Sequence, residues 1–181
     1  MTKKDEQGPE GHDERLAHGY NRMLERVRGL LARPGEPSRL QHAIEIAKER
    51  AQEVGELTRE EAERIAAYMH RDLLDAGNYL SSTGKAIDDW LSFEWAYAED
   101  WIKEMFSKVV DQSRVELEQF TRTPRKLGER YSGEVTAPGV FVCDRCGHEL
   151  TLTRTGHIPP CAHCHGTVFW RRYGAETPDE S

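Results

Sequence analysis

The sequence has no run of 18 apolar residues, and its first ten residues contain no apolar segment like that of a secretory signal. These two absences argue against a membrane protein and predict a soluble, cytoplasmic one. Cysteine is also absent from the first 142 residues, because all four cysteines lie between 143 and 164. None remains to form a disulfide in the rest of the chain. In a reducing compartment this arrangement favours a metal site over disulfides.

Positive charge is scarce for a protein that would bind a nucleic-acid backbone without regard to sequence. The chain carries a formal net charge of -7, and most of its excess acid lies before residue 133. Such binding depends on lysines and arginines that displace counterions from phosphates, so an acidic body argues against it. The segment 133–173 holds four arginines and three acids, and a local basic patch there could still bind.

Apolar residues recur with a helical period of about 3.6 residues through most of residues 12–122. A first helix is predicted up to Arg33-Pro-Gly-Glu-Pro37, because two prolines and a glycine cannot continue it. A second helix is predicted to begin after Ser38, a plausible N-cap, and to end near Gly55. The N-terminal body should therefore be mostly helical.

The stretch Thr58-Arg-Glu-Glu61 reads as a capping box, which predicts the start of a third helix. Residues 78–85 are predicted to form a loop after it. A long fourth helix is predicted from about 88 to 121, with Pro124 as its limit.

The predicted fourth helix is rich in aromatic side chains, with six of them between Trp90 and Phe106. We interpret the stripe from Trp90 to Trp101 as the face of a central helix that packs on two neighbours, since aromatic side chains bury the most apolar area. The alternative is an exposed patch that recruits a partner or a second copy of the chain.

The four cysteines form two Cys-x-x-Cys pairs, Cys143 with Cys146 and Cys161 with Cys164, and 14 residues separate the pairs. Each pair can point its sulfurs at one ion across a tight turn, and two pairs complete a tetrahedral site with no open position. One Zn2+ ion is the default, and iron in a rubredoxin-like site is the alternative that the ligands leave open. A segment of about 40 residues cannot bury enough apolar surface to fold unaided, so we predict that the ion is structural.

Four histidines lie among the cysteines or directly after them, namely His148, His157, His163 and His165. We interpret them as exposed groups or as donors to the ligand sulfurs, with a ligand or acid–base role as the alternative. A redox role for a single Cys-x-x-Cys pair would require a βαβ context, which the sequence does not show.

No segment of the sequence predicts catalysis. His70-Arg-Asp72-Leu73 copies part of a kinase catalytic loop, but the chain lacks the glycine-rich loop and the Asp-Phe-Gly motif. Ser82-Thr-Gly-Lys85 does not match a phosphate-binding loop, because the first glycine and the residue after the lysine are wrong. We therefore predict that the protein is not an enzyme.

After residue 132 the pattern changes to short runs rich in β-branched and aromatic residues, which predict strands at 139–142, 149–153 and 167–173. The predicted fold class is α+β, with a mostly α-helical N-terminal body of antiparallel, coiled-coil-like hairpins and a small C-terminal β zinc ribbon. We expect an elongated molecule with the ribbon at the end of the last helix. The predicted division is a disordered segment 1–11, a helical domain 12–122, a linker 123–132, a zinc ribbon 133–173 and a disordered tail 174–181.

Several stretches resemble the YbeL-like family of small proteobacterial zinc-ribbon proteins, which is described only as a domain of unknown function. The stretches are Gly55-Glu-Leu-Thr58-Arg-Glu-Glu61, Arg71-Asp-Leu73, Tyr131-Ser-Gly-Glu-Val135 and the two cysteine pairs. The resemblance implies a helical N-terminal region, a C-terminal zinc ribbon with the four cysteines as ligands, and no known reaction. One departure is Cys164-His165-Gly166, since ribbons often place glycine directly after each pair.

The favoured function is a non-enzymatic interaction module or adaptor with structural zinc and a protein partner. The candidate contact surface on the ribbon is Arg154, Phe169, Trp170, Arg171 and Arg172. Strand alternation places only one of Phe169 and Trp170 on the inner face. One alternative is a nucleic-acid-binding factor of transcription or translation that uses the ribbon, and a second is a redox or metal sensor. The helices could also form a homo-oligomer.

Overall fold

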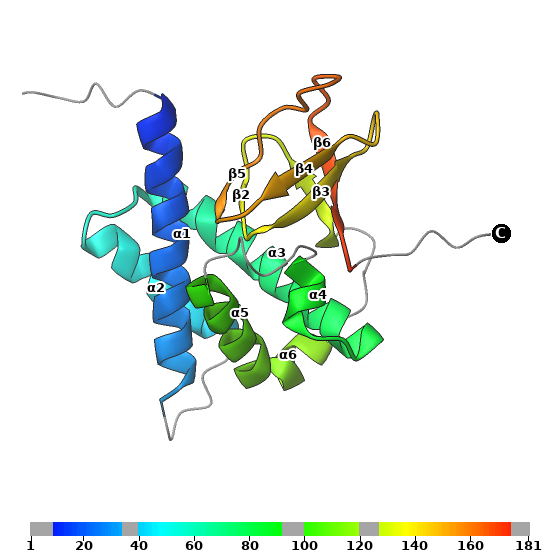
Figure 1. Ribbon diagram of the computed structural model, residues 1–181. Coiled ribbons are helices and arrows are strands. Elements are labelled where there is room, and N and C mark those ends of the chain that lie inside the picture. The colour runs from blue at the N-terminus through cyan, green and yellow to red at the C-terminus, as the bar shows by residue number, and fades with distance from the viewer. Residues whose placement is uncertain (1–8, 34–39, 92–99, 120–126, 175–181) are drawn as a thin grey trace, which may run out of the picture.

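The computed structural model describes residues 9–33, 40–91, 100–119 and 127–174 (Figure 1). Its α+β fold class confirms the prediction, with helices first and a small antiparallel sheet region after them. The helices are α1 (Pro9–Leu31), α2 (Leu40–Glu53), α3 (Arg59–Thr83), α4 (Ile87–Leu91), α5 (Asp100–Gln112) and α6 (Arg114–Gln119). The strands are β1 (Glu129–Tyr131), β2 (Val135–Thr136), β3 (Gly139–Cys143), β4 (Glu149–Leu152), β5 (Gly156–His157) and β6 (Val168–Arg172).

Helices α1, α2 and α3 form where the helical period predicts them, because each buries one apolar stripe against the others. Helix α1 contributes Leu16, Tyr20, Met23 and Val27 to the core, and it packs on α2, α3 and α5. Its first residue is Pro9, so residues 9–11 are helical where disorder was predicted. Proline suits this position because the first helical amide has no partner within the helix. No helix in the described part of the chain has the length and apolar character that crossing a membrane requires.

Helix α3 begins with the predicted capping box. Thr58 accepts a hydrogen bond from the backbone of Glu61, and the Glu61 carboxylate accepts one from the backbone of Thr58. The loop predicted for 78–85 is wrong over 78–83, because α3 continues to Thr83 and ends at Gly84 in a left-handed conformation (φ 68°). The extra turn is held by tertiary packing, since Tyr79 is buried and stacks on Tyr173.

The predicted long fourth helix is also wrong in its continuity. Within the predicted range the structure has α4, α5 and α6, and residues 92–99, between the first two, lie outside the described part. The break between α5 and α6 falls at Ser113, whose hydroxyl donates to the carbonyl of Val109. Within the aromatic stripe, Trp90 is fully buried and Trp101 is partly buried against the same core, whereas Phe93, Trp95 and Tyr97 lie outside the described residues.

The strands form a four-stranded antiparallel sheet in the order β1-β6-β3-β4 and a two-stranded pair, β2 with β5. Strands β3, β4 and β6 lie at the three predicted positions. Strand β1 lies within the stretch 123–132 that was predicted to be a linker, which corrects that prediction for its last residues. Three residues are too few to show a period, and β1 is held instead by the fully buried side chain of Arg130.

The ribbon is not an appendage at the end of an elongated body. Val135 and Ala137 belong to the same apolar core as the helices, while a second, smaller core lies within the ribbon around Phe141 and Phe169. Strand β2 packs on α1 and α3, β5 packs on α1, and β3 reaches α4 (Figure 1). Even Gly174, expected in a loose tail, donates its amide to the carbonyl of Asp89.

Candidate metal centre and its attachment to the helices

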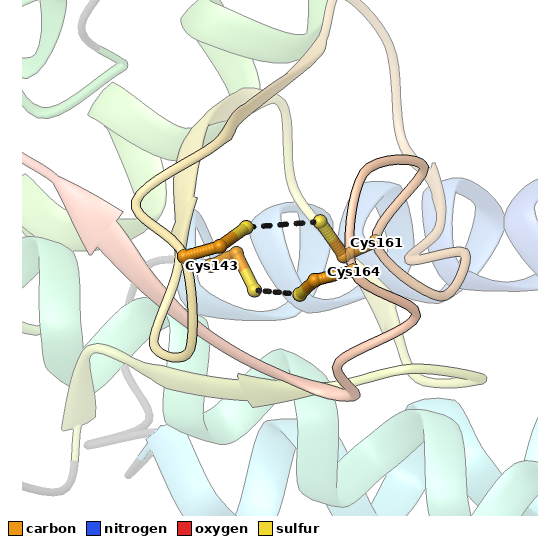
Figure 2. A group of neighbouring side chains, drawn as sticks. Cys143, Cys161 and Cys164 are labelled. Atoms are coloured by element: carbon orange, nitrogen blue, oxygen red, sulfur yellow. Dashed lines mark hydrogen bonds between the residues drawn. The ribbon is translucent and has the colours of Figure 1, made fainter.

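The four predicted ligands meet at one point between two turns. Cys143 ends β3 and Cys146 lies in the turn after it, while Cys161 and Cys164 lie in the turn between β5 and β6 (Figure 2). All four Sγ atoms lie within 4.8 Å of one another, and the pairs Cys143/Cys164 and Cys146/Cys161 are each 3.6 Å apart. Tetrahedral zinc with Zn–S bonds of about 2.3 Å separates its sulfurs by about 3.8 Å. These residues therefore fit one structural Zn2+ ion.

The two turns around the cysteines have the same construction. The amide of Gly147 donates to the carbonyl of Cys143, and the amide of His165 donates to the carbonyl of Cys161, each over 2.9 Å. Both residues have a left-handed backbone, with φ of 72° at Gly147 and 56° at His165. His165 thus takes the position that glycine takes in the first turn, at a cost of roughly 1–2 kcal/mol. The departure from glycine after the second pair leaves the turn geometry intact.

Backbone amides favour ionised sulfur in this centre. The amides of Cys164 and His163 lower the pKa of the Cys161 thiol to about 6. The amide of His148 acts in the same direction on Cys146, but burial and the other three cysteines raise the pKa of that thiol to about 12. The amide of Gly166 points at the sulfur of Cys164 over 3.4 Å, and a Cβ at Gly166 would approach two of the ligand sulfurs closely. Thiolates are the form that binds zinc, so the surrounding backbone is arranged for a bound cation.

The histidines near the centre do not join it. Among the described residues, the one group of His, Cys, Asp and Glu side chains close enough to hold a metal ion is the four cysteines. His148, His163 and His165 are exposed, and the rings of His148 and His163 stack on each other with their centres 6.0 Å apart. Their positions agree with the interpretation of exposed groups beside a closed sulfur shell.

The predicted contact surface divides into accessible and buried members. Arg154 is exposed, and Trp170 and Arg172 are partly exposed. Trp170 donates to Asp144 over 2.9 Å, and Arg172 forms an ion pair with Glu149. Phe169 is buried, as the alternation of inner and outer residues allows.

Arg171 corrects the prediction of a contact residue, because its side chain is fully buried. Its guanidinium lies 4.0 Å from the ring centre of Trp90 and 4.6 Å from that of Phe141. It also donates to the carbonyls of Pro138 and Ala137. Arg171 follows Phe169 by two residues in β6, so strand alternation turns both to the inner face.

Arg171 belongs to a buried charge cluster that joins the ribbon to α3. We define this cluster by Asp72 and Asp75 of α3, Arg130 of β1 and Arg171 of β6. Arg130 Nη2 lies 2.8 Å from Asp72 Oδ1 and 3.3 Å from Asp75 Oδ2, and Arg171 Nε lies 3.5 Å from Asp75 Oδ2. All four side chains are at most 2% exposed.

Neutral groups from both halves of the chain complete the buried charge cluster. Asp72 accepts hydrogen bonds from the hydroxyl of Tyr20 and the amide of Ala137, each over 2.8 Å. Asp75 accepts from Trp90 Nε1 over 3.1 Å and from the hydroxyl of Tyr173 over 2.6 Å. Buried charges are tolerated only when paired and hydrogen-bonded in this way.

The two carboxylates of the cluster respond differently to burial. Burial would raise the pKa of Asp72, but Arg130, Arg71 and Arg171 hold it below its ordinary value. At Asp75 burial outweighs the nearby arginines, and the pKa is raised. Burial together with Arg130 lowers the pKa of Arg171 to about 10. Arg171 is therefore still a cation at neutral pH, and the cluster combines two arginines with two acids.

The sequence carries one signal for this cluster. Asp72 and Asp75 interrupt the apolar stripe of α3 between Met69 and Ala76, and acids on a buried face need cationic partners. The partners could not be chosen from sequence, because Arg130 and Arg171 are two of many arginines.

A closed four-sulfur centre in a small antiparallel sheet defines this chain as a zinc-ribbon protein with a helical N-terminal part. It belongs to the family described as "Zinc-ribbon containing domain", whose pattern matches residues 32–173. It is 26% identical over 129 residues to the "Uncharacterized protein YbeL" of Escherichia coli K12, covering 71% of this chain and 79% of that protein. The YbeL proteins of strains O6:H1 and O157:H7 match to the same extent. No solved structure matches.

Proposed function

We propose that this protein is a non-enzymatic interaction module or adaptor in which zinc has a structural role. The observation that supports this most directly is the buried charge cluster, which fastens the zinc ribbon to α3 and makes helices and ribbon one body. A closed sulfur shell leaves the ion no position for a substrate. The metal then serves to hold the shape of a surface, which is what a docking protein requires.

The accessible part of that surface is the outer face of the four-stranded sheet. Trp170 and Val142 are cross-strand neighbours there, both partly exposed, and Tyr131 near them is 45% exposed. Arg172 lies on the same face, paired with Glu149. An apolar centre with a polar rim is the usual anatomy of a protein interface, and Trp, Tyr and Arg are the residues enriched at its hot spots.

The proposal is tested by affinity purification of the full chain from native cells under reducing conditions. We expect partners that are retained by the wild type, lost with Cys161→Ser, and weakened by Trp170→Ala with zinc content unchanged. Thr167→Ala, an exposed change directly before β6, serves as the matched control. If Cys161→Ser and the wild type retain the same proteins, the folded ribbon is not the interaction surface. We place the protein in the cytoplasm, because its four thiols need a reducing compartment.

Nucleic-acid binding through the ribbon receives less support from the geometry. Arg171 cannot reach a phosphate without leaving the core, and Arg172 is paired with Glu149. Binding of the full chain to single- and double-stranded DNA and RNA at low salt tests this alternative. A drop in affinity with Arg154→Ala and Arg172→Ala would favour it over a protein partner.

A further inference from the structure

A groove runs between helix α1 and the segment 151–157 of the ribbon. Its cavity has a volume of about 710 Å³. One wall is the first half of α1, including Asp13, Glu14 and Asn21. The other wall is the segment 151–157, including Thr151 and Arg154. We call it the α1–β4 groove. It exists only because the ribbon packs against α1, so it is a property of the joined body rather than of either half.

Strand β4 presents a free edge beside this groove. In the sheet order β1-β6-β3-β4, no other described strand lies beyond β4. The amide of Cys143 donates to the carbonyl of His148, which fixes the alternation of hydrogen-bonded pairs along β3 and β4. Leu150 and Leu152 are therefore bonded to β3, and the backbone amide and carbonyl of Thr151 face away from it. An edge of this kind is a template for one more strand.

The groove also contains buried polar atoms without hydrogen-bond partners. Thr155 is 5% exposed, and its Oγ1 has no partner among the described residues. The same holds for Oδ1 of Asn21 on the opposite wall. Leaving a buried polar group unpaired costs about 1–3 kcal/mol. Both atoms are covered, so a ligand would pair with them only after a local shift of the Thr155 or Asn21 side chain, and such pairing would recover part of that cost.

The charge of the groove indicates the chemistry of its ligand. Asp13 and Glu14 are adjacent exposed acids on the α1 wall, and Arg154 is the one lysine or arginine among the lining residues. His157 lies 3.5 Å from Asp13, but burial lowers the pKa of this histidine, so it adds no charge at neutral pH. The α1 wall thus remains acidic and favours a cation.

We propose that the α1–β4 groove binds an extended segment of a partner protein as an added strand on β4, with a lysine or arginine of that segment against Asp13 and Glu14. This inference rests on the proposed function and gives the partner's chemistry. Backbone hydrogen bonds to Thr151 supply affinity, and the acidic wall supplies selectivity for basic segments.

The test uses the full-length, zinc-loaded chain and a phage-displayed library of random heptapeptides. We expect enriched peptides to carry lysine or arginine, and the affinity of one such peptide is then measured by fluorescence anisotropy.

Thr151→Pro removes the backbone amide that faces away from β3 and leaves the hydrogen bonds of its neighbours to β3 in place, whereas Thr151→Val keeps the amide. We expect at least a tenfold loss of affinity with Thr151→Pro and no loss with Thr151→Val. The double change Asp13→Asn, Glu14→Gln should also cost at least tenfold, and it tests the inference even if the proline variant does not fold.

Three results would overturn this inference. They are the absence of enriched peptides, equal binding to Thr151→Pro and the wild type, and a dimer of the chain that Thr151→Pro dissociates in sedimentation. The last result would mean that a second copy occupies the edge. In each case, partners that depend on Trp170 in cells would still support the interaction function, so the two proposals fail separately.

Discussion

The guanidinium of Arg171 in β6 lies 4.0 Å from the centre of the Trp90 ring in α4. This contact spans the boundary between the zinc ribbon and the helices, and both residues also reach Asp75 of α3. A side chain of the ribbon is thus packed inside the helical core. The stability of the two halves should therefore be coupled.

Replacing Arg171 with alanine should lower the free energy of unfolding by about 3–5 kcal/mol, because Asp75 would be left buried with one cationic partner fewer. The matched control is Arg172→Ala, which removes a partly exposed ion pair and should cost less than about 1 kcal/mol. Urea denaturation of both variants at pH 7 measures the difference. Equal effects of the two adjacent changes would mean that the buried position of Arg171 contributes nothing.

Removing zinc should destabilise the helices as well as the ribbon. Without the ion the two cysteine turns separate, and β1 and β6 can no longer hold Arg130 and Arg171 against α3. We expect the helical melting temperature, followed by circular dichroism, to fall by at least about 10 °C with chelator or with Cys161→Ser. His163→Ala, an exposed change inside the second pair, should leave it unchanged. An unaltered helical transition in the chelated protein would show that the ribbon folds apart from the helices.

The metal centre could be predicted because cysteine spacing is a local property, and two pairs with 14 residues between them suffice for one ion. Helices α1 to α3 could be predicted because an apolar period extends over several turns of each. The burial of Arg171 and the partial exposure of Arg172 could not be predicted in this way. Two adjacent arginines indicate a basic surface unless the inner face of β6 is known. Phe169 identifies that face, and alternation then assigns Arg171 to it.

The errors in the helices have a different cause. The apolar period of the predicted fourth helix continues across Ser113. Helix propensity differs too little among ordinary residues to indicate a break there. The predicted end of α3 is too early, because serine and threonine at 82 and 83 are typical of a loop. In the structure the hydroxyls of Ser82 and Thr83 donate to the carbonyl of Tyr79 within the helix. Strand β1 is set by Arg130 and its distant partners in α3, which no local pattern contains.

Glu61 should stabilise the fold at neutral pH but not in acid. Burial would raise its pKa, but Arg15 and the capping contacts with Thr58 lower it from 4.5 to about 2. A carboxyl whose pKa is depressed by folding contributes stability above its unfolded pKa and loses it as the pH falls toward the folded one. Glu61→Gln should therefore cost about 1–3 kcal/mol at pH 7 and almost nothing near pH 2. Urea denaturation across this range is the measurement, and the exposed neighbour Glu60→Gln is the control. A difference that persists at pH 2 would contradict the ionic origin.

Gly77 should be the residue that lets α6 approach α3. A Cβ at this position would lie 2.8 Å from Cδ1 of Leu117, whereas a Cβ at the exposed Gly29 of α1 would meet nothing within 4 Å. Gly29→Ala should raise stability by about 0.5–1 kcal/mol, because alanine favours a helix interior. Gly77→Ala should instead lower it by about 1–3 kcal/mol, since the overlap exceeds the same propensity gain. Thermal unfolding compares the two variants.

Combining Gly77→Ala with Leu117→Ala should lower stability by less than the sum of the single changes, because the second change removes the atoms that the new Cβ would strike. Strict additivity would mean that the two residues are not in contact and that α6 packs elsewhere.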